Sequence, residues 1–243
     1  MLTRDELIRI EELKKTNPEF KYLFERQNEE HRFTISLMSH HIRNLLTMLI
    51  SPFQLIEYFH PEVHDFKYWH ECTGSISCTN CFLERLSDYN HCGEIEPQPC
   101  KLADMLQDFV ISMKKEHQTV DISLILEDSC PQVKGDTMQL SHAMKQLFQN
   151  SCEALPEAEG KINLSLSHND SFCTISITDN GAGFSNDMRQ KLFMPFSTNK
   201  EQHSGLGLCI ANRIVLAHKG YIRLAHTGTD GTCIEVCLPA LAS

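Results

Sequence analysis

The chain contains no apolar run that approaches the roughly 20 residues a membrane-spanning helix requires. Its N-terminus is charged and lacks the apolar core of a secretory signal. It also lacks any long run of lysine and arginine, and its formal net charge is −10 at pH 7. This charge weighs against a nucleic-acid partner, because phosphate backbones need a basic patch. These absences predict a cytoplasmic protein with no membrane span in this chain and no nucleic-acid partner.

The sequence also has no internal repeat, no low-complexity tract and no P-loop. Its Gly160-Lys161 pair is followed by Ile162, where a P-loop would have serine or threonine. Hydrophobic residues make up 41% and charged residues 22% of the chain, as in an ordinary globular protein. In a reducing compartment such as the cytoplasm, the eleven cysteines should stay thiols and pack as small apolar groups.

The first 93 residues show helical periodicity. Residues 1–30 form a highly charged segment, and Asn17-Pro18 should break its helical pattern. Apolar residues then recur along one stripe at steps of three and four: Ile35, Met38, Ile42, Leu45, Leu49 and Phe53. Pro52 should kink or weaken this helix near its end, and a second helix is expected over about 65–89. Residues 31–93 are thus predicted to form an antiparallel hairpin, which a second copy would complete as a dimeric four-helix bundle.

Residues 94–243 show a different pattern. Two prolines within residues 94–99 predict a linker. Beyond it, helices are expected over 102–115, 138–155 and 207–218, and strands over 120–126, 162–166, 173–177, 221–225 and 233–238. Mixed helices and antiparallel strands indicate an α+β domain built as a two-layer α/β sandwich.

Two glycine-containing segments carry candidate chemistry. The first, Asp179-Asn180-Gly181-Ala182-Gly183-Phe184, directly follows a predicted strand, so its carboxylate can accept a hydrogen bond from an amine such as that of adenine. The second, Gly205-Leu206-Gly207, precedes a helix and points backbone N–H groups at an anion such as a triphosphate. Each pattern alone is also common in ordinary turns and helix starts.

A predicted helix adds a third group of polar residues. Gln146, Asn150 and Glu153 lie three or four residues apart and share one face. The amide oxygens of Gln146 and Asn150 are suitable ligands for Mg²⁺, which also takes phosphate oxygens. The segment 193–200 then supplies two phenylalanines, a hydroxyl and an ammonium just before the second glycine pair.

Together these elements, in this order, resemble the ATP-binding domain of the GHKL superfamily, specifically that of bacterial sensor histidine kinases. The resemblance covers roughly residues 97–240 and implies ATP and Mg²⁺ as cofactors. It implies Mg²⁺ binding by Asn150 and Gln146. Residues implied to contact ATP are Asn150, Glu153, Asp179, Gly181, Gly183, Phe193, Phe196, Thr198, Lys200, Ser204, Gly205, Leu206 and Gly207.

The segment 33–46 resembles the phospho-acceptor box of the same family. In that box a serine precedes the acceptor histidine, so the resemblance implies that Ser39 precedes the acceptor His40. At roughly 100° per residue, His40 falls nearly opposite the apolar stripe and should face solvent. Asn44 fits a residue that in many relatives helps dephosphorylate the partner, so phosphatase activity is a further expectation.

Several residues depart from the family pattern. His41 stands where an acidic residue usually takes a proton from the acceptor imidazole, which predicts slower autophosphorylation. Leu45 replaces a proline, so the helix need not bend there. Gln146 stands where hydrolytic relatives have a general-base glutamate, which argues against efficient ATP hydrolysis. His203 and Ser204 replace the usual glycine and threonine and should stiffen the lid over the nucleotide.

The resemblance implies a homodimeric protein histidine kinase that autophosphorylates on His40 and passes the phosphoryl group to the receiver domain of a response regulator. The domains expected are 1–30, 31–93 and 94–243. An ATP-binding phosphotransfer or scaffold protein with weak or no autokinase activity is the main alternative, and another GHKL serine kinase or ATPase is the second.

A metal site among the cysteines is a separate and less favoured possibility. Cys72, Cys78, Cys81 and Cys92 include one Cys-x-x-Cys spacing, and His70 and His91 lie nearby. On a helix, however, Cys78 and Cys81 are simply neighbours on one face. The spacing also lacks a second Cys-x-x-Cys pair, so packing in the bundle is the simpler explanation.

Overall fold

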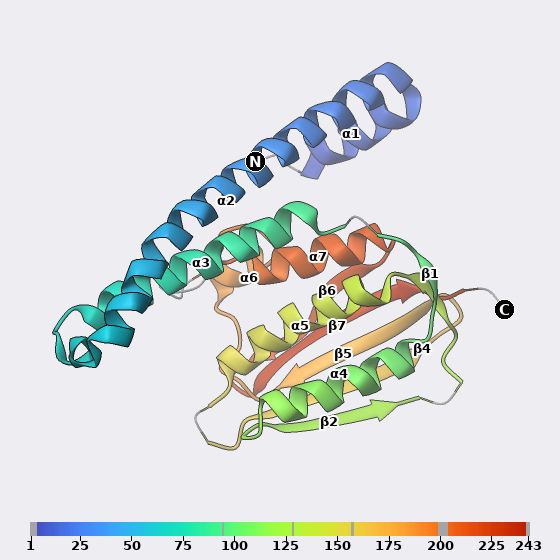
Figure 1. Ribbon diagram of the computed structural model, residues 1–243. Helices are drawn as coiled ribbons and strands as arrows, with labels where there is room; N and C mark the ends of the chain where they lie inside the picture. The colour runs from blue at the N-terminus through green and yellow to red at the C-terminus, as the bar shows by residue number, and fades with distance from the viewer. Residues whose placement is uncertain (1–3, 94, 128, 157, 199–203, 242–243) are drawn as a thin grey trace. The chain divides into compact units, whose positions relative to one another are not determined.

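A computed structural model describes residues 4–93, 95–127, 129–156, 158–198 and 204–241 (Figure 1). The chain forms two compact units, Met1–Asn90 and His91–Ser243. Within the described residues, no helix combines the length and the apolar character needed to cross a membrane.

The first unit is helical. Its elements are α1 (Arg4–Thr16), α2 (Pro18–Phe59), the 3₁₀ helix η1 (Pro61–Asp65) and α3 (Trp69–His91). The predicted break at Asn17-Pro18 is confirmed, because the Asn17 side chain caps α2 by accepting a hydrogen bond from the Phe20 N–H at 3.0 Å. The boundary expected near residue 30 falls inside α2, which is continuous there.

Both ends of the predicted hairpin are fixed by specific contacts. α2 continues past Pro52 to Phe59, and the Phe53 ring packs on the Trp69 ring with centroids 5.2 Å apart. At the other end, the buried Asn90 side chain donates a hydrogen bond to the Arg32 carbonyl at 2.7 Å. These long-range contacts hold the two helices together as a hairpin.

Five of the six residues of the predicted apolar stripe of α2 are exposed in the single chain, and the sixth, Phe53, is half-buried against Trp69. Ile35 is 38% exposed, Ile42 40% and Leu45 61%. The more buried stripe lies one residue further along and includes the fully buried Ser39 and half-buried positions at 36, 43, 46, 50 and 53. The apolar stripe is therefore left open on the surface of the single chain.

The second unit is the predicted two-layer α/β sandwich. Its sheet has the order β2-β4-β5-β7-β6, with β2 and β4 parallel and the other neighbours antiparallel. The helices α4, α5 and α7 lie on one face of the sheet (Figure 1). The strands of this sheet are β2 (Asp121–Leu126), β4 (Lys161–His168), β5 (Phe172–Asp179), β6 (Tyr221–Gly228) and β7 (Gly231–Pro239). The helices are α4 (Leu102–Glu116), α5 (Thr137–Ala154), α6 (Asn186–Gln190) and α7 (Gly207–Ala217).

The core of this unit follows the alternation seen in the sequence. In β4, Ile162, Leu164 and Leu166 are buried and alternate with more exposed residues, as expected for a strand with one covered face. From the helical layer, Phe148 packs edge-to-face on Phe109 with ring centroids 5.8 Å apart. This core fixes the ends of β5 and α5, where the polar motifs lie.

The linker predicted over residues 94–99 is wrong at its end. There β1 (Gln98–Cys100) pairs antiparallel with β3 (Val133–Gly135) in a separate two-stranded sheet, and residue 94 lies outside the described residues. Pro99 lies in this ribbon opposite Lys134. A proline is tolerated there because an edge strand does not need every N–H for pairing.

Candidate functional site

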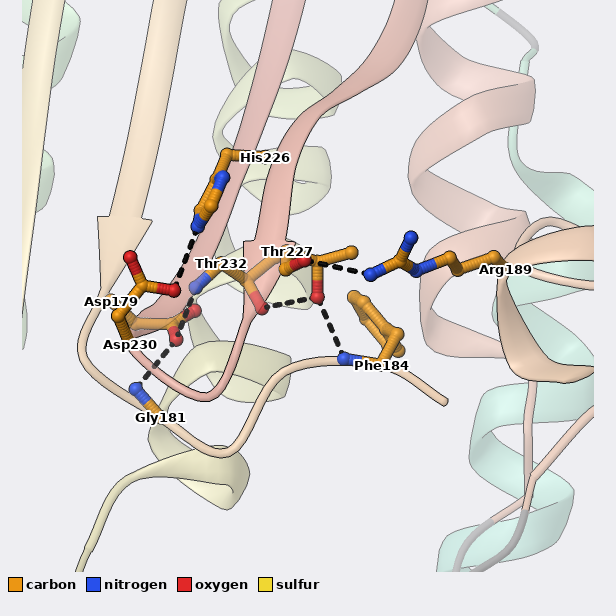
Figure 2. A network of polar contacts seen from close by, with 8 residues as sticks. All are labelled: Asp179, Gly181, Phe184, Arg189, His226, Thr227, Asp230 and Thr232. Atoms are coloured by element: carbon orange, nitrogen blue, oxygen red, sulfur yellow. Dashed lines mark hydrogen bonds and ion pairs between the residues drawn. The ribbon is translucent and has the colours of Figure 1, made fainter. Parts of the chain in front are cut away.

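Asp179 ends β5 and is only 4% exposed. Its Oδ1 accepts hydrogen bonds from the Gly181 N–H at 2.9 Å and the Thr232 N–H at 3.2 Å (Figure 2). Two donors on one oxygen fix the rotation of the carboxylate and leave the lone pairs of Oδ2 for a ligand donor. This geometry is what recognition of an exocyclic amine requires.

The loop after Asp179 needs its glycines for close packing. A Cβ at Gly181 would lie 2.6 Å from the Ala154 carbonyl oxygen, which also accepts a hydrogen bond from the Ala182 N–H at 3.1 Å. Gly183 has a φ of +73°, and a Cβ there would collide with the Gly228 carbonyl. The loop therefore lies against both the end of α5 and the β6–β7 turn.

The second glycine pair lies at the start of α7. Gly205 has a φ of +63°, and a Cβ there would lie 2.7 Å from the Phe196 carbonyl carbon. Leu206, the N-cap of α7, makes no side-chain capping hydrogen bond. The first-turn N–H groups of α7 are thus not capped by that side chain, and the positive end of the helix dipole can meet an anion.

The polar face of α5 faces this helix start. Gln146, Asn150 and Glu153 are all half-buried. A Cβ on Gly207 would lie 3.0 Å from Gln146 Oε1, so that amide lies directly beside the start of α7. The Gln146 Nε2 lies 3.0 Å from His142 Nε2, a contact consistent with this amide orientation. An amide oxygen beside an anion-binding helix start suits Mg²⁺, so Gln146 and Asn150 fit the metal that the resemblance implies.

The remaining ATP-binding residues predicted from the sequence surround the second glycine pair. Phe193 is half-buried, Phe196 is 58% exposed with a φ of +61°, and Thr198 is exposed. The Ser204 hydroxyl accepts a hydrogen bond from the Leu206 N–H at 3.4 Å. Lys200 and His203 lie outside the described residues. The structure therefore brings the segment ending at Phe196 against Gly205, as the motif order predicts.

The end of α5 near Asp179 has a negative environment. Burial, together with the nearby carboxylates of Glu153 and Asp179, raises the pKa of the Cys152 thiol to about 11. The thiol is therefore protonated at neutral pH. This end of the site suits a hydrogen-bond donor, and the start of α7 suits an anion.

Sequence reasoning missed the contribution of the β6–β7 hairpin. Thr232 is 3% exposed and donates to Asp179, and the Thr227 hydroxyl accepts a hydrogen bond from the Phe184 N–H at 2.7 Å. A Cβ on Gly231, whose φ is +129°, would collide with the Asp179 carbonyl. The one signal in the sequence was the pair Gly228 and Gly231, which ordinary hairpins also carry.

The histidine pair lies on the helical unit. His40 and His41 are both exposed, with ring centroids 6.1 Å apart, and Ser39 is buried. The Asn44 Nδ2 lies 3.4 Å from His40 Nδ1, one helical turn away. His40 thus faces solvent, as its place opposite the apolar stripe predicts.

The cysteines of the same unit are arranged as helix neighbours. Cys72, Cys78 and Cys81 are exposed, and Cys92 is buried. Among the described residues, no group of three or more histidine, cysteine or acidic side chains is placed to hold a metal ion. The structure gives no support to a metal site among these cysteines.

Comparison with known proteins adds sequence evidence to this geometry. Residues 135–242 match the family of histidine kinase-, DNA gyrase B- and HSP90-like ATPases. Sporulation kinase D of Bacillus subtilis (strain 168) is 28% identical over 211 residues, which cover 84% of this chain and 41% of that protein. The chain therefore spans less than half the length of this relative.

Two solved structures share the fold of both units. Full-length ShkA, solved in complex with AMPPNP, has a TM-score of 0.66 at 19% identity, covering 86% of this chain and 46% of ShkA. The histidine kinase ThkA, solved in complex with the response regulator TrrA, has a TM-score of 0.65 at 20% identity, covering 91% of this chain and 66% of ThkA. At such identities the likeness shows the fold alone.

The family match includes Asn150, both glycine pairs and the β6–β7 hairpin, which are the parts that form the site. The helical hairpin and the sandwich both recur in the histidine kinase structures. Residues 135–242 therefore carry a domain of the histidine kinase-, DNA gyrase B- and HSP90-like ATPase family, and the chain as a whole is similar to sensor histidine kinases.

Proposed function

We propose that the protein binds ATP, transfers its γ-phosphoryl group to His40 and then passes that group to an aspartate on the receiver domain of a response regulator. The observation that carries the proposal is the buried Asp179 carboxylate, held by two backbone donors on one oxygen. It is a preformed acceptor for the adenine amine. The AMPPNP in ShkA and the response regulator bound to ThkA support the nucleotide and the partner.

Within the site, each end of the nucleotide meets a different kind of group. Asp179 accepts from the adenine amine, and the N–H groups that begin α7 at Gly207 take the phosphate oxygens. Asn150 and Gln146 would hold Mg²⁺, which neutralises charge on the transferring phosphate when it is bound. Gln146 has no carboxylate with which to deprotonate water, which favours transfer to a side chain over hydrolysis.

His40 acts as the nucleophile through a ring nitrogen that is not engaged by Asn44. For Nε2 to carry the lone pair, Nδ1 must carry the proton and donate it to the Asn44 amide oxygen, which a half-turn of that amide allows. Nε2 then forms a bond to the γ-phosphorus, the bond to the bridging oxygen breaks, and ADP leaves. The Nδ1 proton departs afterwards.

In the second step, His40 is the leaving group and the receiver aspartate is the nucleophile. The receiver carboxylate attacks the phosphorus, the N–P bond breaks and His40 regains its proton. Asn44 lies one turn from His40. We propose that it orients a water molecule for dephosphorylation of the regulator. We further propose that the protein is a homodimer, because the stripe containing Ile42 and Leu45 is exposed in the single chain.

Incubation with γ-labelled ATP and Mg²⁺ tests the proposed function. We expect label that is stable in alkali and lost in acid on the wild-type protein, and none on His40→Gln. The matched control is His41→Gln, which should keep the label because it leaves the nucleophile in place. Label on the His40→Gln variant would refute His40 as the acceptor, and ATP binding without any label would favour the phosphotransfer or scaffold alternative.

Replacing His41 by glutamate should accelerate autophosphorylation by about tenfold, less than the roughly 100-fold or more that a fully positioned proton-transfer group contributes. His41 is exposed beside His40, and once protonated its imidazole cannot accept a hydrogen bond from Nδ1 as a carboxylate can, while it adds positive charge beside the site. The initial rate of label incorporation at saturating ATP measures the effect, with His41→Gln as the uncharged control. An unchanged rate would show that His41 does not limit the reaction.

A further inference from the structure

The β6–β7 hairpin contacts both ends of the loop that follows Asp179. At the near end, the Thr232 N–H donates to Asp179 Oδ1 at 3.2 Å. At the far end, the Thr227 hydroxyl accepts from the Phe184 N–H at 2.7 Å (Figure 2). The hydroxyls of Thr227 and Thr232 lie 3.4 Å apart, so the two contacts are joined across the hairpin. The six-residue segment from Asp179 to Phe184 is thus held at both ends by one hairpin.

Thr227 makes a second contact through its backbone. Its carbonyl oxygen accepts a hydrogen bond from Arg189 Nη2 at 2.7 Å, and Arg189 lies on α6, directly after the glycine loop. The side chain and the carbonyl of one residue therefore receive donors from both Phe184 and α6. Thr227 is half-buried and its bond to Phe184 is part-buried, so that bond is less open to competing water than the exposed bond to Arg189.

The close packing around Thr227 leaves little room for the glycine loop to take another conformation. A Cβ on Gly183 would lie 2.9 Å from the Thr227 hydroxyl and would collide with the Gly228 carbonyl. The Gly183–Phe184 backbone therefore lies directly against Thr227 and Gly228. Losing the hydroxyl would leave the Phe184 N–H without its acceptor in a place where the backbone cannot easily reach another.

We infer that Thr227 is a positioning residue for nucleotide binding: its hydroxyl fixes the far end of the glycine loop and thereby the carboxylate of Asp179. This inference rests on the proposed function, since it assigns Asp179 to the adenine. Thr227 itself touches no reacting atom. It acts through Phe184 and through the hydroxyl contact with Thr232, the residue that holds Asp179 in place.

A pair of variants isolates the hydroxyl. Thr227→Ser and Thr227→Ala both remove the γ-methyl group, and they differ only in whether the oxygen that accepts from Phe184 is kept. We expect Thr227→Ala to raise the Kd for ADP by about tenfold, from the loss of one part-buried acceptor, and Thr227→Ser to stay within about twofold of wild type. Calorimetric titration with ADP and Mg²⁺ on the full chain measures both.

Amide hydrogen exchange separates a local effect from loss of folding. In the absence of nucleotide, Thr227→Ala should speed exchange at Phe184 and Gly181 while leaving the central strands β4 and β5 protected, and Thr227→Ser should restore the slow rates. Uniformly faster exchange in all strands, or equal ADP affinities for the two variants, would overturn the inference. A wild-type protein that binds no ADP would instead overturn the proposed function.

Discussion

Replacing Asp179 by asparagine is expected to weaken ADP binding by about 100-fold while leaving the sandwich folded. The asparagine carbonyl oxygen can still accept from the Gly181 and Thr232 N–H groups, so the internal hydrogen bonds of the loop survive. Its amide nitrogen then replaces Oδ2. This group carries N–H donors and therefore cannot accept a hydrogen bond from the amine of the ligand. Calorimetric titration with ADP measures the loss, and a thermal melt checks the fold.

Asp230→Asn is the matched control for this variant. Asp230 lies in the same hairpin, but its side chain is 76% exposed and pairs with His226 at 2.9 Å. The hydrogen bond from His226 lowers the pKa of Asp230, so this carboxylate stays charged to lower pH than that of an ordinary aspartate. The same chemical change there should leave the ADP affinity within about twofold. If Asp179→Asn bound ADP as tightly as wild type, Asp179 would not be the adenine acceptor.

The parts of the site that the sequence predicted share a local origin. Gln146 and Asn150 lie one turn apart on α5, so helical periodicity alone places them on one face. Gly181 and Gly183 follow β5 directly and belong to the same turn as Asp179. The proximity of such residues can be predicted without knowing the tertiary fold, because they lie only a few residues apart in the sequence.

The parts that the sequence missed depend on pairing between distant segments. Thr232 reaches Asp179 only because β5 and β7 pair antiparallel in the register that sets these two residues opposite each other. A shift of one residue would turn Thr232 to the other face of the sheet. Alternation predicts that both strands exist, but it does not determine which residue lies opposite Asp179.

Prediction of the helical unit from the sequence has a similar limit. The apolar stripe through Ile42 and Leu45 was identified from its spacing, but spacing does not say which surface will cover it. The more buried stripe includes Ser39 and Arg43, whose polar side chains gave no hydrophobic signal. An apolar stripe left exposed beside a more polar buried one is the reason for proposing that a second copy completes the helical unit.

Replacing Leu45 by aspartate should therefore convert a dimer into a monomer. Leu45 is 61% exposed in the single chain and continues the stripe that contains Ile35 and Ile42. In a symmetric dimer the substitution places two carboxylates in an apolar interface, and burying them without partners should raise the dissociation constant by at least about 100-fold. Light scattering coupled to gel filtration at micromolar concentration gives the molar mass directly.

Thr47→Asp is the control for the dimer test, because Thr47 is exposed on the same helix about 200° of helical rotation away from Leu45. It adds the same charge to α2 without entering the stripe. We expect Thr47→Asp to remain a dimer. If both variants kept the mass of the wild type, or if Thr47→Asp alone dissociated, the stripe would not be the dimer interface. A monomeric wild type would show that the exposed stripe is covered by something other than a second copy of this chain.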